Sequence, residues 1–521
     1  MSGKLLKNTA IVGTMTLLSR VLGLLRDMVL ARFGVFAGMD AFFVAFKIPN
    51  FMRRLFAEGA FSQAFVPVLS EYKSQRPHQE VHALVNRVAG TLMGVLTLLV
   101  VVCVLASPVL VVIFAPGFLR DPDKFELTAQ MLRLTFPYLL FVSLVAFAAG
   151  ILNTYGRFAA AAFAPVWLNV VLIGAALWVA PLLEQPVIAL AAGVFAAGLV
   201  QILFLLPALR RIRMFPRPRW GGRDEGVRRI LKLMVPGIVG SSVAQINLLF
   251  DTLIASFLVT GSVSWLYYSD RLVEFPMGVF AIALSTVILP SLSRHHAENS
   301  GQEFMQTLDW GLRWVLMIGL PSTLGLFLLA GPILTTLFQY GEFTGSDVEM
   351  AALSLSAYAF GLPAFMLVKI LAPAFYSRKD TRTPVRIAII SMASNMLLNV
   401  VFVVPMVLLD VRGPHAGLAL ATSVAAYVNA GLLYRRLRQD GIYVPMPGWL
   451  RLVAQLCIAS VVMVILLLWG VAPLPEWGGW SGWKRVLHLT LWVFAGSGAY
   501  LLALWMLGLR PSRFWSVASS R

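Results

Sequence analysis

Nine cations lie within stretches of sequence that are otherwise apolar, and these residues have the clearest chemical potential in the chain. They are Arg20, Arg26, Lys47, Arg53, Arg54, Arg133, Arg271, Arg313 and Lys369. A guanidinium stays ionised and matches phosphate oxygens through two parallel hydrogen bonds. In lipid, a charged side chain costs at least roughly 2.5–3.5 kcal/mol, so it usually faces a water-filled cavity or a partner.

Acidic residues accompany some of these cations. Asp40, Lys47 and Arg54 recur every seven residues and would share one helix face, with Arg53 and Glu58 beside it. In the second half of the chain, Asp270 and Glu274 lie within one helical turn of Arg271. We expect these residues to line one cavity, where the bias toward arginine predicts an anionic ligand such as a phosphate or diphosphate. The predicted binding residues are Arg20, Arg26, Lys47, Arg53 and Arg271, with Asp40, Glu58, Asp270 and Glu274 as polar partners.

The alternative is that these cations snorkel to the membrane surface or form structural ion pairs between helices. We assign Arg133, Arg313 and Lys369 to that alternative. Asp251, in an apolar helix, could hold a coupling cation or make a helix–helix hydrogen bond. No metal site is expected, because no acidic or cysteine partner completes a ligand set around His78 and His82 or around His295 and His296. No phosphate-binding loop, nucleophile elbow or zinc-protease motif occurs in a supporting context, so no enzyme is predicted.

The composition places these residues in a membrane protein. Of 521 residues, 59% are apolar and 13% charged, with a mean hydropathy of +0.81. A water-facing fold could not bury so much apolar surface, so a soluble globular protein is excluded. The net charge of +18 would suggest nucleic acid in a soluble protein, but here it is expected from topology signals and anionic lipids.

Fourteen apolar runs are long enough to cross a bilayer, which predicts an all-α polytopic membrane protein. They are 8–32, 39–72, 82–114, 126–153, 158–181, 186–209, 230–259, 262–292, 307–337, 348–376, 384–408, 416–435, 450–471 and 486–508. The second run is too long for one straight crossing and contains Pro49, Gly59 and Pro67, so we expect a bend there. Twenty-seven of the 42 cations fall on one side of the runs and six on the other, which predicts that both termini are cytoplasmic.

An internal repeat divides the chain. LRDMVLARF (25–33) matches LFDTLIASF (249–257), and VPVLSEY (66–72) matches LPSLSRH (289–295). The repeat predicts two six-helix lobes, at 1–209 and 230–440, whose helices run in the same order and direction. A basic cytoplasmic linker at 210–229 joins them. Residues 441–521 add two helices and a cytoplasmic tail.

Several stretches resemble the MurJ-type lipid II flippase family along nearly the whole chain. They are SRVLGLLRD (19–27), DAFFVAFKIPNFMRRLFAEGAFSQAFVPVLSEY (40–72), SVSWLYYSDRLVEFPMGVFAIALSTVILPSLS (262–293) and FYSRKDTRTPV (375–385). The resemblance implies two lobes around a central cavity, with the last two helices forming a groove for a lipid tail. It also implies that Arg20, Arg26, Arg53 and Arg271 are the essential cavity arginines.

The same resemblance implies the function. The family moves the undecaprenyl-diphosphate-linked disaccharide-pentapeptide, lipid II, from the cytoplasmic to the periplasmic leaflet of the bacterial inner membrane, for peptidoglycan synthesis. Alternating access is expected to involve no cofactor, with Na⁺, H⁺ or the membrane potential as the driving force, and with lipid II and membrane lipids, but no nucleic acid, as partners of a monomer. The family's sodium site is harder to place, with Asp251 and Asp380 as candidates. The alternatives are a multidrug or oligosaccharide exporter of the same superfamily and a membrane glycosyltransferase.

Overall fold

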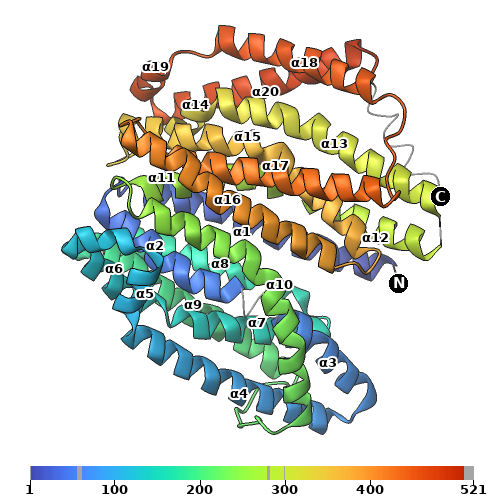
Figure 1. Ribbon diagram of the computed structural model, residues 1–521. Helices are drawn as coiled ribbons and strands as arrows, with labels where there is room; N and C mark the ends of the chain where they lie inside the picture. Colours follow the sequence, from blue (N-terminus) through green and yellow to red (C-terminus); the bar gives the residue numbers. More distant parts are fainter. Residues whose placement is uncertain (1, 55–60, 279–281, 299, 510–521) are drawn as a thin grey trace. The chain divides into compact units, whose positions relative to one another are not determined.

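The apolar runs fold into helices, because a helix satisfies its own backbone hydrogen bonds where no water can do so. A computed structural model describes residues 2–54, 61–278, 282–298 and 300–509 (Figure 1). All regular secondary structure in these residues is helical. The chain divides into two compact units, residues 1–264 and 265–521.

The helices of the first unit follow each other closely along the chain. They are α1 (Ser2–Ala31), α2 (Ala37–Arg53), α3 (Ser62–Gln75), α4 (His78–Leu105), α5 (Ser107–Phe114), α6 (Pro122–Thr135), α7 (Tyr138–Thr154), α8 (Phe158–Gly174), α9 (Pro186–Arg211) and α10 (Glu225–Ala255), with short η2 (Pro116–Arg120), η3 (Ala175–Val179) and η4 (Ala180–Leu182) segments. The first residues of α11 (Ser262–Pro276) also belong to this unit.

The second unit contains the rest of α11 and the helices that follow it. They are α12 (Ile282–Ala297), α13 (Gly301–Leu328), α14 (Ala330–Phe338), α15 (Gly345–Tyr376), α16 (Arg382–Leu408), α17 (His415–Gln439), α18 (Trp449–Gly470), α19 (Leu474–Gly479) and α20 (Gly482–Met506).

Ten helical segments of the described chain are long and apolar enough to cross a membrane. They are His78–Leu105, Pro122–Thr154, Phe158–Leu182, Pro186–Arg211, Gly301–Leu328, Gly345–Tyr376, Arg382–Leu408, His415–Gln439, Trp449–Gly470 and Gly482–Met506. The other four predicted runs contain the charged candidate residues, and two of them, 39–72 and 262–292, are each divided between helices shorter than 18 residues, α2 and α3 in the first and α11 and α12 in the second. The membrane-protein prediction is supported, and the count of fourteen crossings stays a prediction.

Several of these helices expose their apolar side chains. Leu98 on α4, Leu397 on α16, Leu468 on α18 and Phe494 on α20 are each at least 66% exposed. Such surface would be unfavourable in water and is suited to contact with lipid tails.

The helix bounds agree with the predicted repeat. Ala31 and Ala255, which the repeat aligns, are the last residues of α1 and α10. Pro67 and Pro290, also aligned, both lie inside helices, α3 and α12. The segment with Gly59, where a bend was expected, lies outside the described residues.

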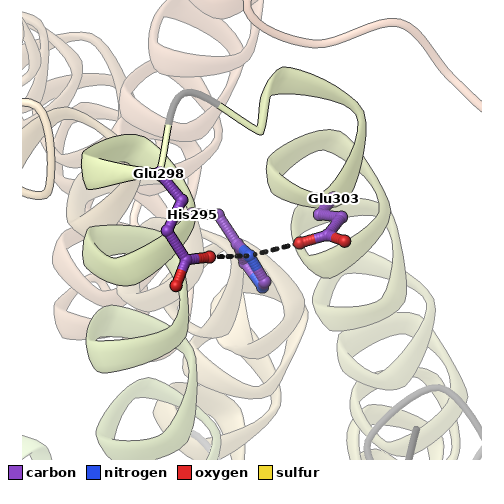
Figure 2. A group of neighbouring side chains, drawn as sticks. All are labelled: His295, Glu298 and Glu303. Carbon is purple, nitrogen blue, oxygen red and sulfur yellow. Dashed lines mark ion pairs between the residues drawn. The ribbon is translucent and has the colours of Figure 1, made fainter. Parts of the chain in front are cut away.

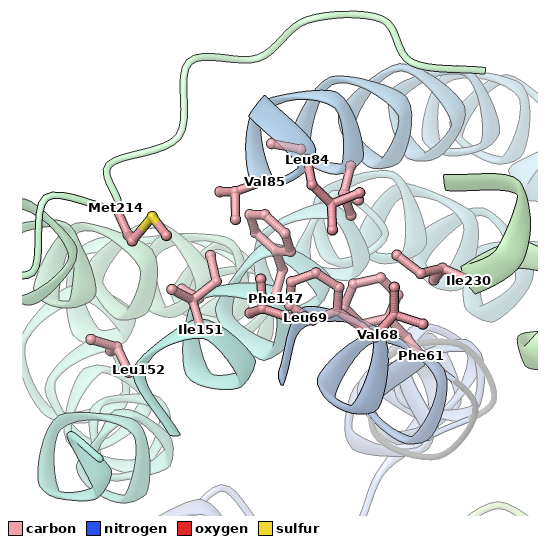
Figure 3. Packing of buried hydrophobic residues seen from close by; sticks show 14 of the residues in the cluster. Phe61, Val68, Leu69, Leu84, Val85, Phe147, Ile151, Leu152, Met214 and Ile230 are labelled. Atoms are coloured by element: carbon pink, nitrogen blue, oxygen red, sulfur yellow. The ribbon is translucent and has the colours of Figure 1, made fainter. Parts of the chain in front are cut away.

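The basic linker is fastened to α4. Between α9 and α10, the amide of Arg217 donates to Oδ1 of Asn86 (2.6 Å), the amide of Arg219 to the Asn86 carbonyl (2.9 Å) and the amide of Gly221 to Oγ1 of Thr91 (3.1 Å). A Cβ at Gly90 would lie 2.2 Å from the Arg219 carbonyl oxygen, so only glycine permits this approach. Met214 of the same linker is buried in an apolar cluster with residues of α3, α4, α7 and α10 (Figure 3).

In the second unit, two buried charged residues hold the C-terminal helices. Asp309 on α13 accepts hydrogen bonds from Tyr443 (2.7 Å) and Trp449 (2.8 Å), on the segment that leads into α18. Burial and the hydrogen bond to Asp309 raise the pKa of Tyr443, which therefore stays a donor. Arg485 on α20 is 7% exposed and donates to four carbonyl oxygens. These belong to Trp477 (2.9 Å), Thr335 (3.2 Å), Gln339 (2.9 Å) and Gly478 (2.8 Å).

We expect Arg485→Lys to loosen α19 and the start of α20, because an ammonium cannot reach four acceptors that diverge in this way. The loss of charge-assisted hydrogen bonds should cost roughly 2–4 kcal/mol locally. Amide hydrogen exchange over residues 474–482 should speed up accordingly. Lys484→Ala, a change at the adjacent exposed cation, is the control; equal exchange in both variants would contradict the role given to Arg485.

Candidate substrate-binding site

Arg26 is buried between α1 and α8. Its guanidinium donates to Oδ1 of Asp27 through Nε (3.0 Å) and Nη2 (2.7 Å), and to Oδ1 of Asn169 through Nη1 (3.1 Å). Asn169 in turn donates to the Ser19 carbonyl (3.0 Å). Arg26 is only 5% exposed and Asp27 2%. These bonds commit the guanidinium to protein partners and favour a role in joining two helices.

Arg20, six residues earlier on α1, has a different environment. It is partly buried and has no hydrogen bond or ion pair within the part of the chain that the structure describes. A cation of this kind keeps its bonding capacity for a ligand. Arg20 is therefore better placed than Arg26 to bind an anion directly.

Asp40 differs most from the prediction, because its partners are not the predicted cavity cations. Its carboxylate, 1% exposed, forms an ion pair with Lys124 (2.9 Å), which is also buried. It also accepts hydrogen bonds from the Gly261 amide (2.8 Å) and from the amide (3.0 Å) and hydroxyl (2.6 Å) of Ser264. Asp40 thus caps the start of α11, where a negative charge is favourable. The seven-residue spacing suggested that Asp40 and Lys47 face one cavity. The carboxylate of Asp40 is instead buried against Lys124.

Lys47 and Arg53, the two remaining predicted binding residues of the first unit, lie on α2, and Arg54 follows its last residue. Nε of Arg53 donates to Oδ1 of Asn50 (2.7 Å), one turn earlier. Arg53, Arg54 and Lys47 are all partly exposed. Glu58, the predicted acidic companion, lies outside the described residues.

In the second unit, the predicted pairing of Arg271 is confirmed. Its Nη1 lies 2.9 Å from Oε2 of Glu274, one turn along α11, and its guanidinium lies 5.2 Å from the centre of the Tyr267 ring. The side chains of Arg271 and Glu274 are 30% and 36% exposed, so this is a partly hydrated pair. Asp270 is also partly exposed. Whether Arg271 converges with the cations of the first unit stays a prediction.

The two candidates for a coupling cation differ in their surroundings. Asp251 is 7% exposed near the end of α10. Asp380 lies in the turn before α16 and accepts a hydrogen bond from the Thr383 amide (3.0 Å). Partial burial acts to raise the pKa of Asp380, but the hydrogen bonds of Thr383 and the charge of Arg378 lower it overall. Asp380 thus acts as an ionised helix cap, whereas Asp251 is a buried carboxylate on α10, and a coupling cation at either residue stays a prediction.

Sequence reasoning missed several partners. Asp27 was visible beside Arg26, whereas Asn169 and Lys124 lie 143 and 84 residues from the side chains they bind. No acidic partner was expected to complete a ligand set around His295 and His296, but two acidic side chains lie near His295. Glu298 and Glu303 lie beside it, because the turn between α12 and α13 brings Glu303 back.

Comparison with known proteins decides the family. The family model described as lipid II flippase MurJ matches residues 29–484. The chain belongs to the MurJ family. It is 49% identical over 517 residues to the probable lipid II flippase MurJ of Vibrio cholerae, covering 98% of this chain and 97% of that one. It is 43% identical to the lipid II flippase MurJ of Burkholderia cenocepacia, with 96% and 97% covered.

Solved structures agree with the MurJ assignment. A structure of lipid II flippase MurJ in an inward closed conformation superposes with a TM-score of 0.79, at 26% identity, covering 95% of this chain and 98% of that chain. An inward-facing transporter of the multidrug resistance MATE family has a TM-score of 0.67 at 15% identity, which shows a shared fold alone. Arg20, Arg26, Arg53 and Arg271 are thus charged residues on the helices of a MurJ fold.

Proposed function

We propose that this protein moves lipid II from the cytoplasmic to the periplasmic leaflet of the bacterial inner membrane and thereby supplies peptidoglycan synthesis. Membership of the MurJ family over nearly the whole chain carries this proposal. The drug-exporter alternative has only the shared fold in its favour.

The cations on the apolar helices fit the chemistry of such a substrate. A diphosphate offers pairs of oxygens that the planar guanidinium fork can bind through two hydrogen bonds. Arg20, Lys47, Arg53 and Arg271 are partly exposed and would bind the diphosphate directly. Arg26, with its guanidinium engaged by Asp27 and Asn169, would act as a positioning residue that keeps α1 against α8.

The transport route follows from the remaining predictions. Fourteen crossings with both termini in the cytoplasm would form two lobes, 1–209 and 230–440, with the linker at 210–229 on the cytoplasmic side. Rocking of the lobes would expose the bound headgroup to either side in turn. The polyprenyl tail would stay in lipid, along a groove formed by α18 and α20, whose exposed leucines and aromatic residues suit an alkyl chain.

A driving force is needed to return the empty protein to its starting state. One elementary charge moving through 100 mV gains about 2.3 kcal/mol, so the membrane potential could act on the cationic site. A coupling cation at Asp251, a buried carboxylate on α10, is the alternative source. A monomer would suffice for either route.

A leaflet assay for lipid II tests the function. In cells depleted of their own flippase, expression of this chain should restore growth and return lipid II to the outer leaflet, where an impermeant enzyme that cleaves the exposed headgroup detects it. Lipid II that stays inaccessible while the chain is correctly inserted would refute the proposal. If the purified protein instead polymerised the glycan of lipid II, the alternative of a membrane glycosyltransferase would be favoured.

A further inference from the structure

Three side chains with metal-binding atoms meet where α12 ends and α13 begins. Nδ1 of His295 lies 2.9 Å from Oε2 of Glu303 and 3.9 Å from Oε2 of Glu298. All three potential ligand atoms lie within 4.8 Å of one another. Figure 2 shows the two carboxylates directed toward the imidazole from the two helices.

The imidazole is aimed into this cluster and shielded from water. His295 is 8% exposed, and its Nδ1 makes no hydrogen bond within the described residues although the Glu303 carboxylate lies close by. A buried polar nitrogen without a hydrogen bond is unfavourable. The two carboxylates are exposed and can adjust their positions.

The packing of the two helices holds the cluster in place. Ile288 on α12 approaches Gly311 on α13 so closely that a Cβ at Gly311 would lie 2.6 Å from the Ile288 side chain. At the turn, the Ser300 amide donates to the His295 carbonyl (2.9 Å). Glu303, in the first turn of α13, therefore faces His295.

We propose that His295, Glu298 and Glu303 bind a divalent transition-metal ion, with Zn²⁺ as the best match. One imidazole nitrogen and two carboxylates form the mixed nitrogen and oxygen set that Zn²⁺ accepts. Donor atoms around Zn²⁺ lie about 2.0–2.2 Å from the metal, so small rotations of the two glutamates would complete the contact. Water would fill the remaining position.

Binding would clamp the end of α12 to the start of α13. It would also neutralise two carboxylates beside the buried histidine. This site lies apart from the substrate-binding residues in the sequence, and the inference does not depend on the proposed transport function.

Titration of the metal-stripped, full-length protein in detergent tests the site. Zn²⁺ added alone should bind at one equivalent by calorimetry, and Co²⁺ should give the absorption bands of a low-symmetry site. His295→Ala and Glu303→Gln should each weaken Zn²⁺ binding by at least about tenfold. Glu303→Gln keeps the shape of the side chain, so it serves if His295→Ala fails to fold. His296→Ala, at the adjacent exposed histidine, is the matched control and should bind as the unmodified protein does.

Two results would overturn the proposal. One is the absence of saturable Zn²⁺ binding, which would leave His295 and Glu303 as a simple ion pair. The other is binding that survives both His295→Ala and Glu303→Gln, or that is lost equally in His296→Ala, because the metal would then lie elsewhere.

Discussion

Arg53→Ala and Arg271→Ala are each expected to reduce lipid II transport by about 100-fold or more while the protein still inserts and folds. Each change removes two charge-assisted hydrogen bonds to a diphosphate, at roughly 1.5–3 kcal/mol each. The fold should tolerate both changes, because Arg53 bonds locally to Asn50 and the Arg271–Glu274 pair is partly exposed. Complementation of a flippase-depleted strain, with the leaflet assay as a quantitative measure, tests this expectation.

Lysine variants separate the effect of positive charge from the effect of guanidinium geometry. Arg53→Lys and Arg271→Lys keep the positive charge but lose the fork, so they should transport poorly if two-point binding matters. Arg133→Ala is the control, since Arg133 on α6 is 44% exposed at its side chain and lies 3.8 Å from Glu126. Full transport by both alanine variants would show that Arg53 and Arg271 do not bind the diphosphate.

Asp40→Ala is expected to destabilise the protein by roughly 3–5 kcal/mol, because it leaves Lys124 charged and buried without its partner. The Gly261 and Ser264 amides would also lose their acceptor. The thermal unfolding midpoint in detergent should fall on the order of 10 °C. This effect would appear in the absence of any substrate.

A double substitution distinguishes this explanation from general damage to the helix. Asp40→Ala combined with Lys124→Met removes both charges, so it should recover part of the lost stability. Arg76→Ala, which breaks an exposed pair with Glu80, should change stability by less than about 1 kcal/mol. If Asp40→Ala unfolds at the temperature of the unmodified protein, the buried pair has no structural importance.

The sequence was sufficient for the membrane class and the helical fold, whereas the repeat of two six-helix lobes stays a prediction. Apolar runs of about 20 residues and the order of cations along them carry that information. It was also sufficient for Arg271 and Glu274, because residues three apart on one helix are neighbours whatever the rest of the fold does.

Contacts between distant helices could not be predicted in the same way. Asn169 beside Arg26, Lys124 beside Asp40 and Glu303 beside His295 depend on how separate helices pack. Spacing along one helix shows which of its side chains share a face. It does not show which side chains of a neighbouring helix lie opposite that face. Asp40 illustrates this point. Its seven-residue spacing suggested that it shares a helix face with Lys47, but its ion-pair partner, Lys124, lies on α6.

The linker between α9 and α10 is held by its main chain. Asn86 and Thr91 bind its peptide nitrogens, so the arginine side chains at 217 and 219 are exposed and contribute nothing to those bonds. The number of positive charges there can therefore change over evolutionary time without altering the path of the chain. For the same reason, these two positions could carry a reporter dye or an affinity handle with little disturbance to the surrounding helices.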